Sequence, residues 1–525
     1  MKRIRIFSSI IALLFFLITI RVFIISTVNH KEYSNAAAIQ RRSETAVRSA
    51  RKILYDRNMI PLTDSTSDLY AIILCEKLTE RTKINSLLGT TLPERGVEIV
   101  DMPADKAVQS ELLSCDGVSA LTMPVRYFKN NLFCHLIGYG GYTNGSGLEK
   151  ALDGALITDK SQAVVTVKSA KEHPLWTQGY YSPSETDLSG VKLTADLHIQ
   201  KICEQVMDEM CPRGAVVVAD TRNGDILAMV SRPAYSQDNP SKYFSGGGSE
   251  LLNRAISAYD MGSVFKIIVT GAALEEGILK TDDIYICTGS CKIGEIDFYC
   301  HEKNGHGSIT FEQAFAQSCN IPFYELGQKL GWETIRAYAQ KAGLGKNIID
   351  LAIDEAHGNL PPRADSAPAL ANLSIGQGNM NGTPLQVAQM VQIVANGGIK
   401  IPLSIIDGRI KADGEALVKS IRASSDRVFS TKTALILRRF MEKTVAEGTG
   451  QPAKSSLVTI AGKTGSAETG WQENGETMTH GWFAGFFPVD KPRYVCVVLC
   501  ENGKWGGSSA GPVFKKIAEQ ISTLY

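Results

Sequence analysis

The amino-terminal segment constrains this chain most, because it holds a long apolar run behind a basic flank. The run extends from Ile6 to Ser26 and is interrupted by Arg21. A helix needs about 20 mostly apolar residues to cross a bilayer, and this segment meets that requirement if Arg21 extends its charge to the interface. We therefore predict a short cytoplasmic tail and one transmembrane helix over residues 1–28.

The basic flank, Lys2, Arg3 and Arg5, predicts the orientation of this helix. Positive charges beside a membrane segment stay in the cytoplasm, so the rest of the chain is expected outside. A cleaved signal peptide would have a shorter apolar core that ends in a small-x-small site, and Ile25-Ser26-Thr27 is a poor match. The segment thus indicates a single-pass anchor in the plasma membrane, with the remaining chain extracytoplasmic.

Composition excludes other classes of protein for the remaining chain. Of the 525 residues, 44% are hydrophobic and 21% are charged, which is typical of a globular protein and not of a disordered one. The 55 basic and 54 acidic residues nearly cancel, whereas a nucleic-acid-binding protein usually carries a concentrated basic surplus. We therefore expect no nucleic-acid partner.

A large unit that mixes strands with helices begins near Val191. Two apolar runs flank the turn signal Asn223-Gly224, which predicts a β-hairpin. Helices are expected at 265–276, 311–317, 384–396 and 512–524, and strands at 215–220, 226–230, 457–460, 481–487 and 494–499. Strand pairs at both ends with helices between them predict an α+β domain with a central antiparallel sheet flanked by helices.

One motif in this unit has the pattern of an activated nucleophile. Ser263 and Lys266 stand one turn apart at the start of a predicted helix, so the amine can reach the hydroxyl. A serine hydroxyl is a poor nucleophile without such a base. A lone Ser-x-x-Lys is more often a helix cap, and the second example, Ser189 to Lys192, leads into a strand because of Gly190.

Two further motifs change this interpretation. Ser318-Cys319-Asn320 lies at the end of a predicted helix, and Lys463-Thr464-Gly465-Ser466 follows a β-prone run. Ser-x-x-Lys, Ser-x-Asn and Lys-Thr-Gly in this order are the signature set of penicillin-binding proteins and serine β-lactamases. With these motifs, the chain resembles a class B penicillin-binding protein.

The resemblance extends over nearly the whole chain. Further segments that match the family are Arg51–Asn58, Gly147–Glu149, Asn253–Ala255, Gly376–Gly378, Gly448–Gly450 and Trp482–Gly485. The resemblance implies an extended dimerisation or pedestal domain with linker over 29–190, and a penicillin-binding/β-lactamase-like transpeptidase domain over 191–525. A cysteine-rich insert is most similar to that of sporulation-type members, although septal and elongation members remain possible relatives.

The resemblance also implies residue roles. Ser263 is the nucleophile, Lys266 takes its proton, and Ser318 relays a proton to the leaving group. Asn320 holds a substrate amide. The substrate-binding strand is Lys463, Thr464, Gly465 and Ser466. In it, Lys463 supplies positive potential, while Thr464 and Ser466 bind the terminal carboxylate.

The implied activity is penicillin-sensitive cross-linking of peptidoglycan stem peptides through an acyl-enzyme, with no cofactor. Implied partners are stem peptides, β-lactams and a membrane glycosyltransferase. A D,D-carboxypeptidase of the same fold, or a non-catalytic β-lactam-binding scaffold or sensor, are the alternatives. A phosphate-binding loop ending in Lys463-Thr464 would lack its first glycine, so we expect no nucleotide.

The cysteines leave two interpretations open. Cys287, Cys291, Cys300, His301 and His306 are suitable zinc ligands, but their spacing matches no standard zinc finger. Loop thiols or a local disulfide are therefore favoured, and no metal is expected. A disulfide between Cys300 and Cys319 would tie the Ser318–Asn320 motif to the cysteine-rich insert. Both Cys496 and Cys500 are expected in the core.

Overall fold

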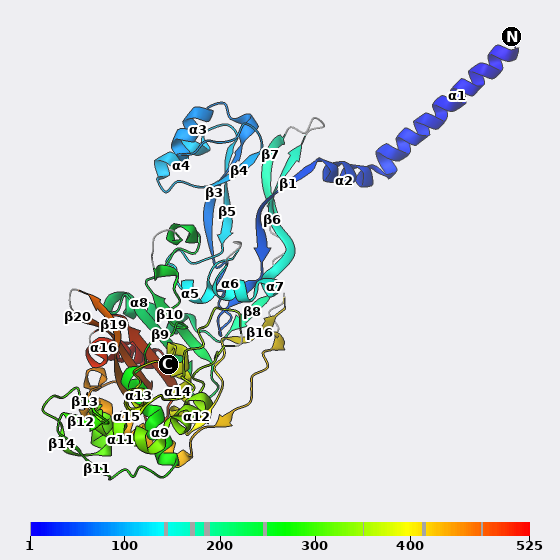
Figure 1. The fold of residues 1–525 in the computed structure, drawn as a ribbon. Helices are drawn as coiled ribbons and strands as arrows, with labels where there is room; N and C mark the ends of the chain where they lie inside the picture. The colour runs from blue at the N-terminus through cyan, green and yellow to red at the C-terminus, as the bar shows by residue number, and fades with distance from the viewer. Residues whose placement is uncertain are drawn as a thin grey trace. The chain divides into compact units, whose positions relative to one another are not determined.

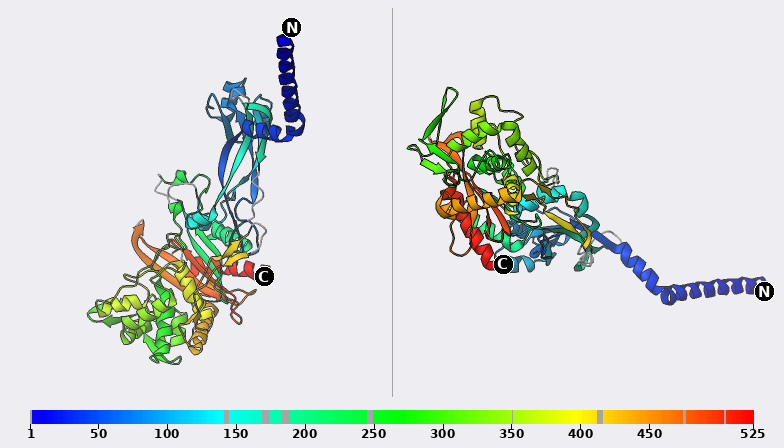
Figure 2. Two further views of the ribbon diagram at one scale, coloured as in Figure 1. Left: turned by 90° about the vertical axis from the view of Figure 1, so that its right-hand side faces the viewer. Right: turned by 90° about the horizontal axis from the view of Figure 1, so that it is seen from below.

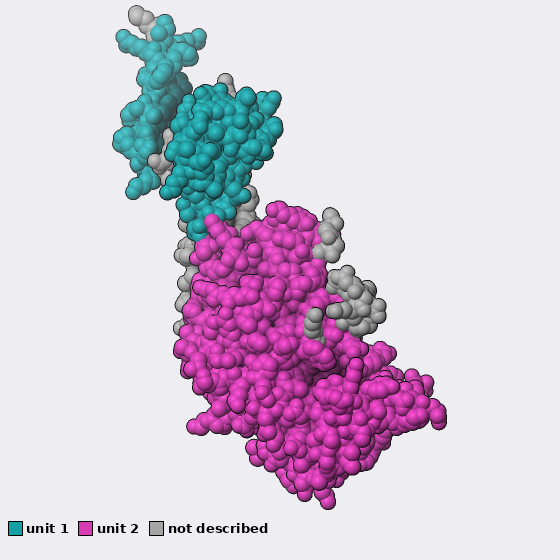
Figure 3. All heavy atoms as spheres, turned by 90° about the vertical axis from the view of Figure 1, so that its left-hand side faces the viewer, with its two compact units in different colours: residues 1–51, 67–124, 157–187 teal, residues 52–66, 125–156, 188–525 magenta. Residues whose placement is uncertain are grey.

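A computed structural model of the protein describes residues 2–140, 145–168, 174–182, 189–244, 249–349, 351–411, 416–473, 476–503 and 505–525. The chain forms two compact units, which Figure 3 colours separately. The first comprises residues 1–51, 67–124 and 157–187, and the second comprises residues 52–66, 125–156 and 188–525. Two segments of the predicted 29–190 domain thus belong to the second unit. The boundary at residue 190 stays a prediction, and residues 183–188 of the expected linker lie outside the described residues.

The first unit begins with a long apolar helix (Figure 1). Helix α1, Lys2–Phe23, continues as a π-helical segment, Ile24–Val28, and these 27 residues are long and apolar enough to cross a membrane. Its large apolar side chains are exposed. Such a continuous exposed apolar surface is typical of a membrane or protein contact, and it agrees with the anchor predicted over 1–28.

Two small sheets form the rest of the first unit. One contains the antiparallel strands β1 (Arg42–Arg51), β6 (Ile157–Lys168) and β7 (Pro174–Ser182). The other contains β3 (Thr66–Leu74), β4 (Val97–Asp101) and β5 (Val118–Val125). Helices α2 (His30–Arg41), α3 (Arg81–Leu88) and α4 (Lys106–Leu113) complete the unit. Ile84 of α3 and Leu112 of α4 join Ile73 of β3 in a small apolar core.

Five antiparallel strands form the central sheet of the second unit, in the order β10-β9-β21-β20-β19. Their bounds are β9 Gly214–Asp220, β10 Ile226–Arg232, β19 Ala461–Glu473, β20 Glu476–Phe487 and β21 Tyr494–Cys500. The predicted β9–β10 hairpin therefore pairs, through β9 and β21, with strands from the end of the chain. This confirms the predicted α+β fold with an antiparallel central sheet.

Helices cover both faces of this sheet (Figures 1 and 2). Val216 and Val218 of β9 pack in one apolar cluster with helices α8 (Leu197–Met210) and α16 (Gly506–Leu524). The alternate residue Val217 packs in the other cluster, with helix α14 (Pro384–Ala395). Successive side chains of a strand point to opposite faces, and both faces of β9 are covered, so the strand is apolar from Ala215 to Ala219. Helix α14 is buried along its whole length.

The remaining elements of the second unit surround this core. The helices are α5 (Cys134–Ile137), α6 (Gly147–Ala151), α7 (Asp153–Leu156), α9 (Lys266–Glu275), α10 (Phe311–Ala316), α11 (Ile321–Leu330), α12 (Trp332–Ala342), α13 (Ala367–Ser374) and α15 (Thr431–Glu447). A second sheet has the strand order β17-β16-β8-β2. Its strands are β17 (Ala416–Lys419), β16 (Ile406–Ile410), β8 (Gly190–Leu193) and β2 (Ile53–Tyr55). Short pairs are β11 (Ile284–Cys287) with β14 (Gly307–Thr310), β12 (Ser290–Ile293) with β13 (Ile296–Tyr299), and β15 (Ile399–Lys400) with β18 (Asp426–Arg427).

Two sequence-based boundaries are wrong. The strand expected at 457–460 is a loop, with Leu457 exposed, and the strand begins instead at Ala461. The β-prone residues 457–460 have no partner strand, and pairing with a partner decides whether a strand forms. The last helix begins at Gly506, before Pro512, because its first turns pack against β20. The predicted start at Pro512 therefore falls inside the helix.

A disulfide joins Cys211, after α8, to Cys500 at the end of β21, with their Cα atoms 6.0 Å apart. Cys500 is buried as predicted, but its pairing with Cys211 was not predicted from the sequence. Cys496 lies on the same strand as a free, buried thiol. The bond closes a loop that contains most of the second unit. Such cross-links stabilise a fold chiefly by restricting the unfolded chain.

A buried ion pair also ties two distant segments of the second unit. The Arg254 side chain is fully buried, and its Nε donates a hydrogen bond to Glu501 Oε1 at 2.8 Å. The Tyr259 hydroxyl donates to the same oxygen at 2.8 Å. Burial favours the neutral carboxyl, but the hydrogen bond and charge of Arg254 outweigh it and lower the pKa of Glu501. The pair fixes the Arg254 segment to the end of β21.

We expect Glu501→Gln to lower the free energy of unfolding by about 3–5 kcal/mol, because Arg254 then stays buried without a counter-charge. The pKa of Glu501 is lower in the folded state than in the unfolded state. Its stabilisation is therefore present above the unfolded-state pKa and is lost as pH falls through the folded-state value.

Thermal unfolding of the full chain in detergent across pH measures both effects. The wild-type Tm should fall toward that of Glu501→Gln at acidic pH. As a control, Asp365→Asn breaks an exposed pair with Arg363 and should leave the Tm nearly unchanged. Equal Tm values for wild type and Glu501→Gln at neutral pH would contradict the prediction.

Candidate active site

The three sequence motifs meet at one cavity of the second unit. The cavity has a volume of about 1040 Å³, and its wall includes Ser263, Ser318, Asn320, Thr464 and Ser466. These residues come from the turn before α9, the loop between α10 and α11, and strand β19. Residues that are far apart in the sequence therefore face one space.

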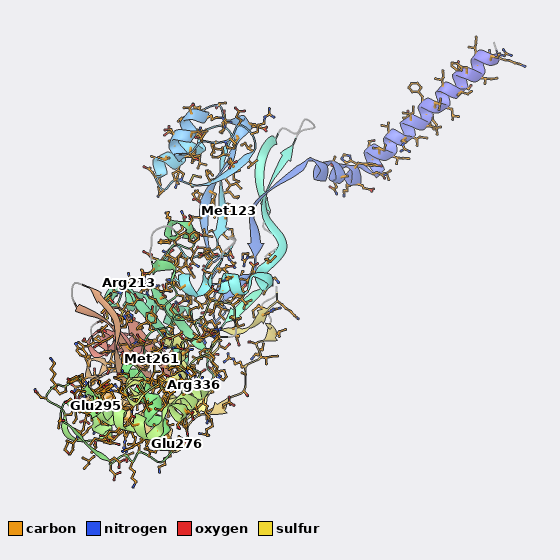
Figure 4. All side chains as sticks on the ribbon, viewed as in Figure 1. Met123, Arg213, Met261, Glu276, Glu295 and Arg336 are labelled. Atoms are coloured by element: carbon orange, nitrogen blue, oxygen red, sulfur yellow. A yellow bond between two sulfur atoms is a disulfide. The ribbon has the colours of Figure 1, made fainter. Side chains whose placement is uncertain are left out.

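Ser263 lies in a single 3-10 turn, Gly262–Phe265, that runs directly into helix α9. Met261, labelled in Figure 4, precedes the turn, and Gly262 has a left-handed φ of 53°. An added Cβ at Gly262 would lie 2.7 Å from the carbonyl oxygen of Ser466. Glycine therefore permits both the turn and the close passage of β19, which holds Ser263 at the cavity wall.

Gly465 keeps strand β19 close to the Ser263 turn. A Cβ on Gly465 would lie 2.8 Å from Val264 Cγ2 and 2.9 Å from the carbonyl oxygen of Met261. Gly506, at the start of α16, approaches the same strand, and a Cβ there would lie 2.0 Å from the Gly465 carbonyl oxygen. The glycine of the third motif is thus needed for backbone packing and does not itself contribute a side chain.

The Lys266 amine binds the second motif. Its Nζ donates hydrogen bonds to the carbonyl oxygen of Ser318 at 2.8 Å and to Asn320 Oδ1 at 2.7 Å. Longer bonds reach Ser318 Oγ at 3.4 Å and the Cys319 carbonyl oxygen at 3.3 Å. Burial lowers the pKa of Lys266 to about 7, because the ammonium loses water. A share of this amine is therefore neutral, and able to accept a proton, near neutral pH.

The Ser-x-x-Lys spacing predicts that the Lys266 amine reaches the Ser263 hydroxyl, but the amine has other hydrogen-bond partners in the structure. Within the described residues, every hydrogen bond of the amine goes to the Ser318–Asn320 segment and none goes to Ser263. The carbonyl and amide oxygens of that segment satisfy the buried amine better than a single hydroxyl does. Both side chains nevertheless belong to one site, because Ser263 and Ser318 line the same cavity.

Ser318 stands between two lysines. Its Oγ accepts a hydrogen bond from Lys463 Nζ at 2.9 Å, in addition to the longer bond from Lys266. Ser318 is a non-glycine residue with a left-handed φ of 57°, a costly conformation that aims its hydroxyl at both amines. Such strain is found at functional sites, where the surrounding contacts hold it in place.

Strand β19 supplies the third wall. Lys463 is fully buried, and burial followed by the positive charge of Lys266 lowers its pKa well below the usual value. Thr464 and Ser466 line the cavity. The backbone N–H of Gly506 donates to Ser466 Oγ at 3.1 Å, which orients this hydroxyl.

The structure also adds residues that sequence reasoning did not assign to the site. Thr449 Oγ1 and Thr464 Oγ1 lie 2.6 Å apart, so Thr449 orients the hydroxyl of the third motif. The wall further includes Gln377, Gly378 and Trp505. The family-like segments 376–378 and 448–450 contain three of these four positions, but no spacing rule placed them in the cavity.

The nucleotide-binding alternative does not fit this geometry. Lys463 and Thr464 lie near the start of the extended strand β19, paired with Ala484 and Phe483 of β20. A phosphate-binding loop needs a glycine-rich turn before a helix. The segment is therefore a sheet edge facing the cavity and cannot wrap a phosphate.

The arrangement can activate a serine. One wall hydroxyl, Ser263, shares the cavity with Ser318, whose oxygen accepts from two amines with lowered pKa values. The Lys266 amine, whose pKa is about 7, can accept a proton from a hydroxyl nucleophile. Potential metal ligands also lie beside the cavity, since Cys287, Cys300, His306 and Cys319 have ligand atoms within 4.8 Å of one another.

Comparison with known proteins shows which family the chain resembles. Residues 214–519 match the family described as the penicillin-binding protein transpeptidase domain. The chain is 32% identical over 438 residues to stage V sporulation protein D of Bacillus subtilis (strain 168), which covers 79% of this chain and 66% of that protein. This chain therefore aligns with just under two thirds of that relative's length.

Two further proteins are similar over most of the chain. Peptidoglycan D,D-transpeptidase PbpA of Mycolicibacterium smegmatis is 30% identical over 401 residues, covering 71% of this chain and 78% of that protein. A solved chain from a peptidoglycan synthase complex has the same fold, with a TM-score of 0.70 at 23% identity over 98% of this chain and 97% of that chain. With the domain match spanning more than half of its length, the chain belongs to the class B penicillin-binding proteins.

Proposed function

We propose that this protein is a penicillin-sensitive serine D,D-transpeptidase that cross-links peptidoglycan stem peptides through an acyl-enzyme on Ser263. The observation that carries the proposal is the position of the Ser318 hydroxyl. It accepts hydrogen bonds from both buried lysines and lines the same cavity as Ser263. The names of the family and of the similar transpeptidase support the same reaction.

The first step forms the acyl-enzyme. Ser263 Oγ attacks the carbonyl carbon between the two terminal D-alanines, and its proton passes to the Lys266 amine. The C–N bond then breaks, and the leaving D-alanine amine takes a proton through Ser318. Catalytic hydrogen bonds often tighten only in the substrate complex, so the missing Ser263–Lys266 bond does not conflict with this step.

The second step transfers the acyl group. The amine of a second stem peptide attacks the ester carbon, an amide bond forms, the ester bond breaks, and Ser263 regains its proton. β-Lactams acylate the same serine. Backbone N–H groups of Ser263 and Ser466 stabilise the oxyanion, a contribution of typically about 3–4 kcal/mol per donor.

The other site residues bind the substrate. Asn320 holds a substrate amide, Lys463 supplies positive potential, and the Thr464 and Ser466 hydroxyls bind the terminal carboxylate. The cavity supports this assignment because Asn320, Thr464 and Ser466 all line it. A substrate carboxylate can accept charge-assisted hydrogen bonds from these two hydroxyls.

The proposed location is the outer face of the plasma membrane. The apolar helix Lys2–Val28 is long enough for a single span, and the basic residues before it favour the cytoplasm. We propose a membrane glycosyltransferase as the partner that supplies glycan strands. The similar solved chain from a peptidoglycan synthase complex supports that kind of partner through its fold alone.

We expect fluorescent penicillin to label the full chain covalently and Ser263→Ala to remove the label, because the ester requires the Ser263 oxygen. Gel fluorescence after denaturation measures the adduct. The matched control is Ser189→Ala, which alters the other Ser-x-x-Lys; its following residues form strand β8, and labelling should be unchanged. Persistent labelling of Ser263→Ala would refute the proposed nucleophile.

We expect Gly465→Ala to slow penicillin acylation by about 100-fold while the protein still folds. The added methyl displaces β19 from the Ser263 turn, and a shift of about 1 Å in a catalytic group can cost this much. Stopped-time labelling measures the rate, and circular dichroism checks the fold. The control Gly154→Ala has open space around the new methyl and should react at the wild-type rate. A wild-type rate for Gly465→Ala would show that the close approach is dispensable.

The acyl acceptor separates cross-linking from the carboxypeptidase and scaffold alternatives. With glycan strands bearing pentapeptide stems, we expect cross-linked stem dimers by mass spectrometry, because a second stem amine takes the acyl group. Free D-alanine with no dimers would indicate transfer to water and a carboxypeptidase. Penicillin labelling without either product would indicate a binding scaffold or sensor.

A further inference from the structure

The active-site cavity continues along strand β19 beyond the third motif, where it meets a carboxylate. Glu468 of β19 and Thr479 of β20 line the cavity together with Thr464 and Ser466. The two strands pair Glu468 directly with Thr479. Among the described residues that line the cavity, Glu468 is the single aspartate or glutamate. The end of the cavity at Glu468 therefore carries negative charge.

Three cavity-lining side chains of β19 form a row. Thr464, Ser466 and Glu468 alternate with Gly465 and Ala467, and Ala467 is fully buried in the main apolar core. Because successive side chains of a strand point to opposite faces, the row lies on one face. A rise of about 3.4 Å per residue places each member about 6.8 Å from the next. The row thus presents two hydroxyls and then a carboxylate at regular spacing.

The Glu468 carboxylate is available to a ligand. Its side chain is exposed, and among the described residues no ion pair or hydrogen bond engages it. The cross-strand partner Thr479 adds a hydroxyl to the same part of the cavity. A carboxylate binds an ammonium through charge-assisted hydrogen bonds, which are stronger than those between neutral groups. A cationic group is thus the chemical class that fits this end of the cavity.

Strand β19 has an open edge along which an extended peptide can lie. It is the last strand in the sheet order, and within the described residues only β20 pairs with it. Extended peptides add to such edges through backbone hydrogen bonds, and their alternate side chains are read by pockets. A peptide that runs antiparallel to β19, with its terminal carboxylate at Thr464 and Ser466, has its upstream residues beside Glu468.

The stem peptide of the proposed reaction carries both charges that this row would recognise. Its last residue supplies the carboxylate. The same type of stem also supplies the attacking amine, and this amine must lie upstream because the two terminal D-alanines have no side-chain amine. At about 3.4 Å per residue, two residues of an extended peptide span about 6.8 Å, which matches the spacing from Ser466 to Glu468.

We propose that Glu468 binds the side-chain ammonium of the stem peptide that donates the acyl group, and that it selects donors whose amine is free. The proposal rests on the transpeptidase function proposed above and adds a specificity-determining residue to it. Glu468 recognises a group that is remote from the reacting bond. A stem whose amine is already cross-linked loses this ion pair, so stems that have not yet been cross-linked become the preferred donors.

The test compares donors with free and with acetylated amines. Glycan strands bearing pentapeptide stems are prepared in both forms, and a D-amino acid other than alanine is added in excess to take the acyl group. The terminal D-alanine leaves and the added amino acid replaces it, so released D-alanine counts every donor used. Since the acceptor is the same in both reactions, any preference belongs to the donor.

For the full wild-type chain in detergent, we expect kcat/KM to be about fivefold higher for the free-amine donor, the size of a good exposed ion pair. The difference should lie in KM, because the ammonium is bound equally before and during acyl transfer. This comparison needs no variant.

We expect Glu468→Gln to reduce the preference to about one by raising KM for free-amine strands. Glu468→Lys should reverse the preference, since the new ammonium repels that of the donor. The matched control Glu333→Gln removes the same charge from helix α12, where Glu333 is exposed and outside the cavity, and should keep the fivefold preference. The ratio of two donors within one variant does not depend on the amount of active enzyme, so partial misfolding cannot imitate these results.

Two results would overturn the proposal. One is equal kcat/KM for free and acetylated donors in wild type. The other is a wild-type preference that persists in both Glu468→Gln and Glu468→Lys. If neither donor releases D-alanine from a chain that penicillin labels at Ser263, the transpeptidase function fails and the donor site fails with it. Turnover without preference leaves the Ser263 chemistry intact, so the two failures are distinguishable.

Discussion

Two buried lysine amines that meet at one serine hydroxyl are the constraint on which the site depends. An ammonium that loses its water is unstable unless it gains partners, and a second positive charge nearby raises the cost. Lys266 offsets this through oxygens of the Ser318–Asn320 segment, while Lys463 bonds to Ser318. The remaining cost lowers both pKa values, and the value of about 7 for Lys266 makes proton acceptance by this amine possible near neutral pH.

Close backbone packing holds this arrangement together. The Ser263 turn, strand β19 and the start of α16 approach so closely that side chains on Gly262, Gly465 or Gly506 would collide with neighbouring backbone atoms. The central sheet fixes β19 through β20, and helices on both faces fix the sheet. The catalytic geometry is therefore a property of the whole second unit, and a small displacement of one layer would move the hydroxyls relative to the amines.

The Ser318–Asn320 loop is held from two sides. On one side, Lys266 binds three of its residues; on the other, the sulfur of Cys319 lies against Cys300. The left-handed conformation of Ser318 is costly by itself, so it needs contacts on both sides.

The sequence by itself determined the parts that depend on neighbouring residues: the apolar anchor, the β9–β10 hairpin around Asn223-Gly224, and helix α14. Motif order also indicated the family, because the chemistry needs particular residue types. Tertiary structure alone decided the β19 strand at the third motif, the Thr449–Thr464 contact, the Cys211–Cys500 disulfide and the meeting of Cys319 with the insert. Each of these joins residues distant in the chain, and the packing of sheets and helices, which no local pattern encodes, sets which of them touch.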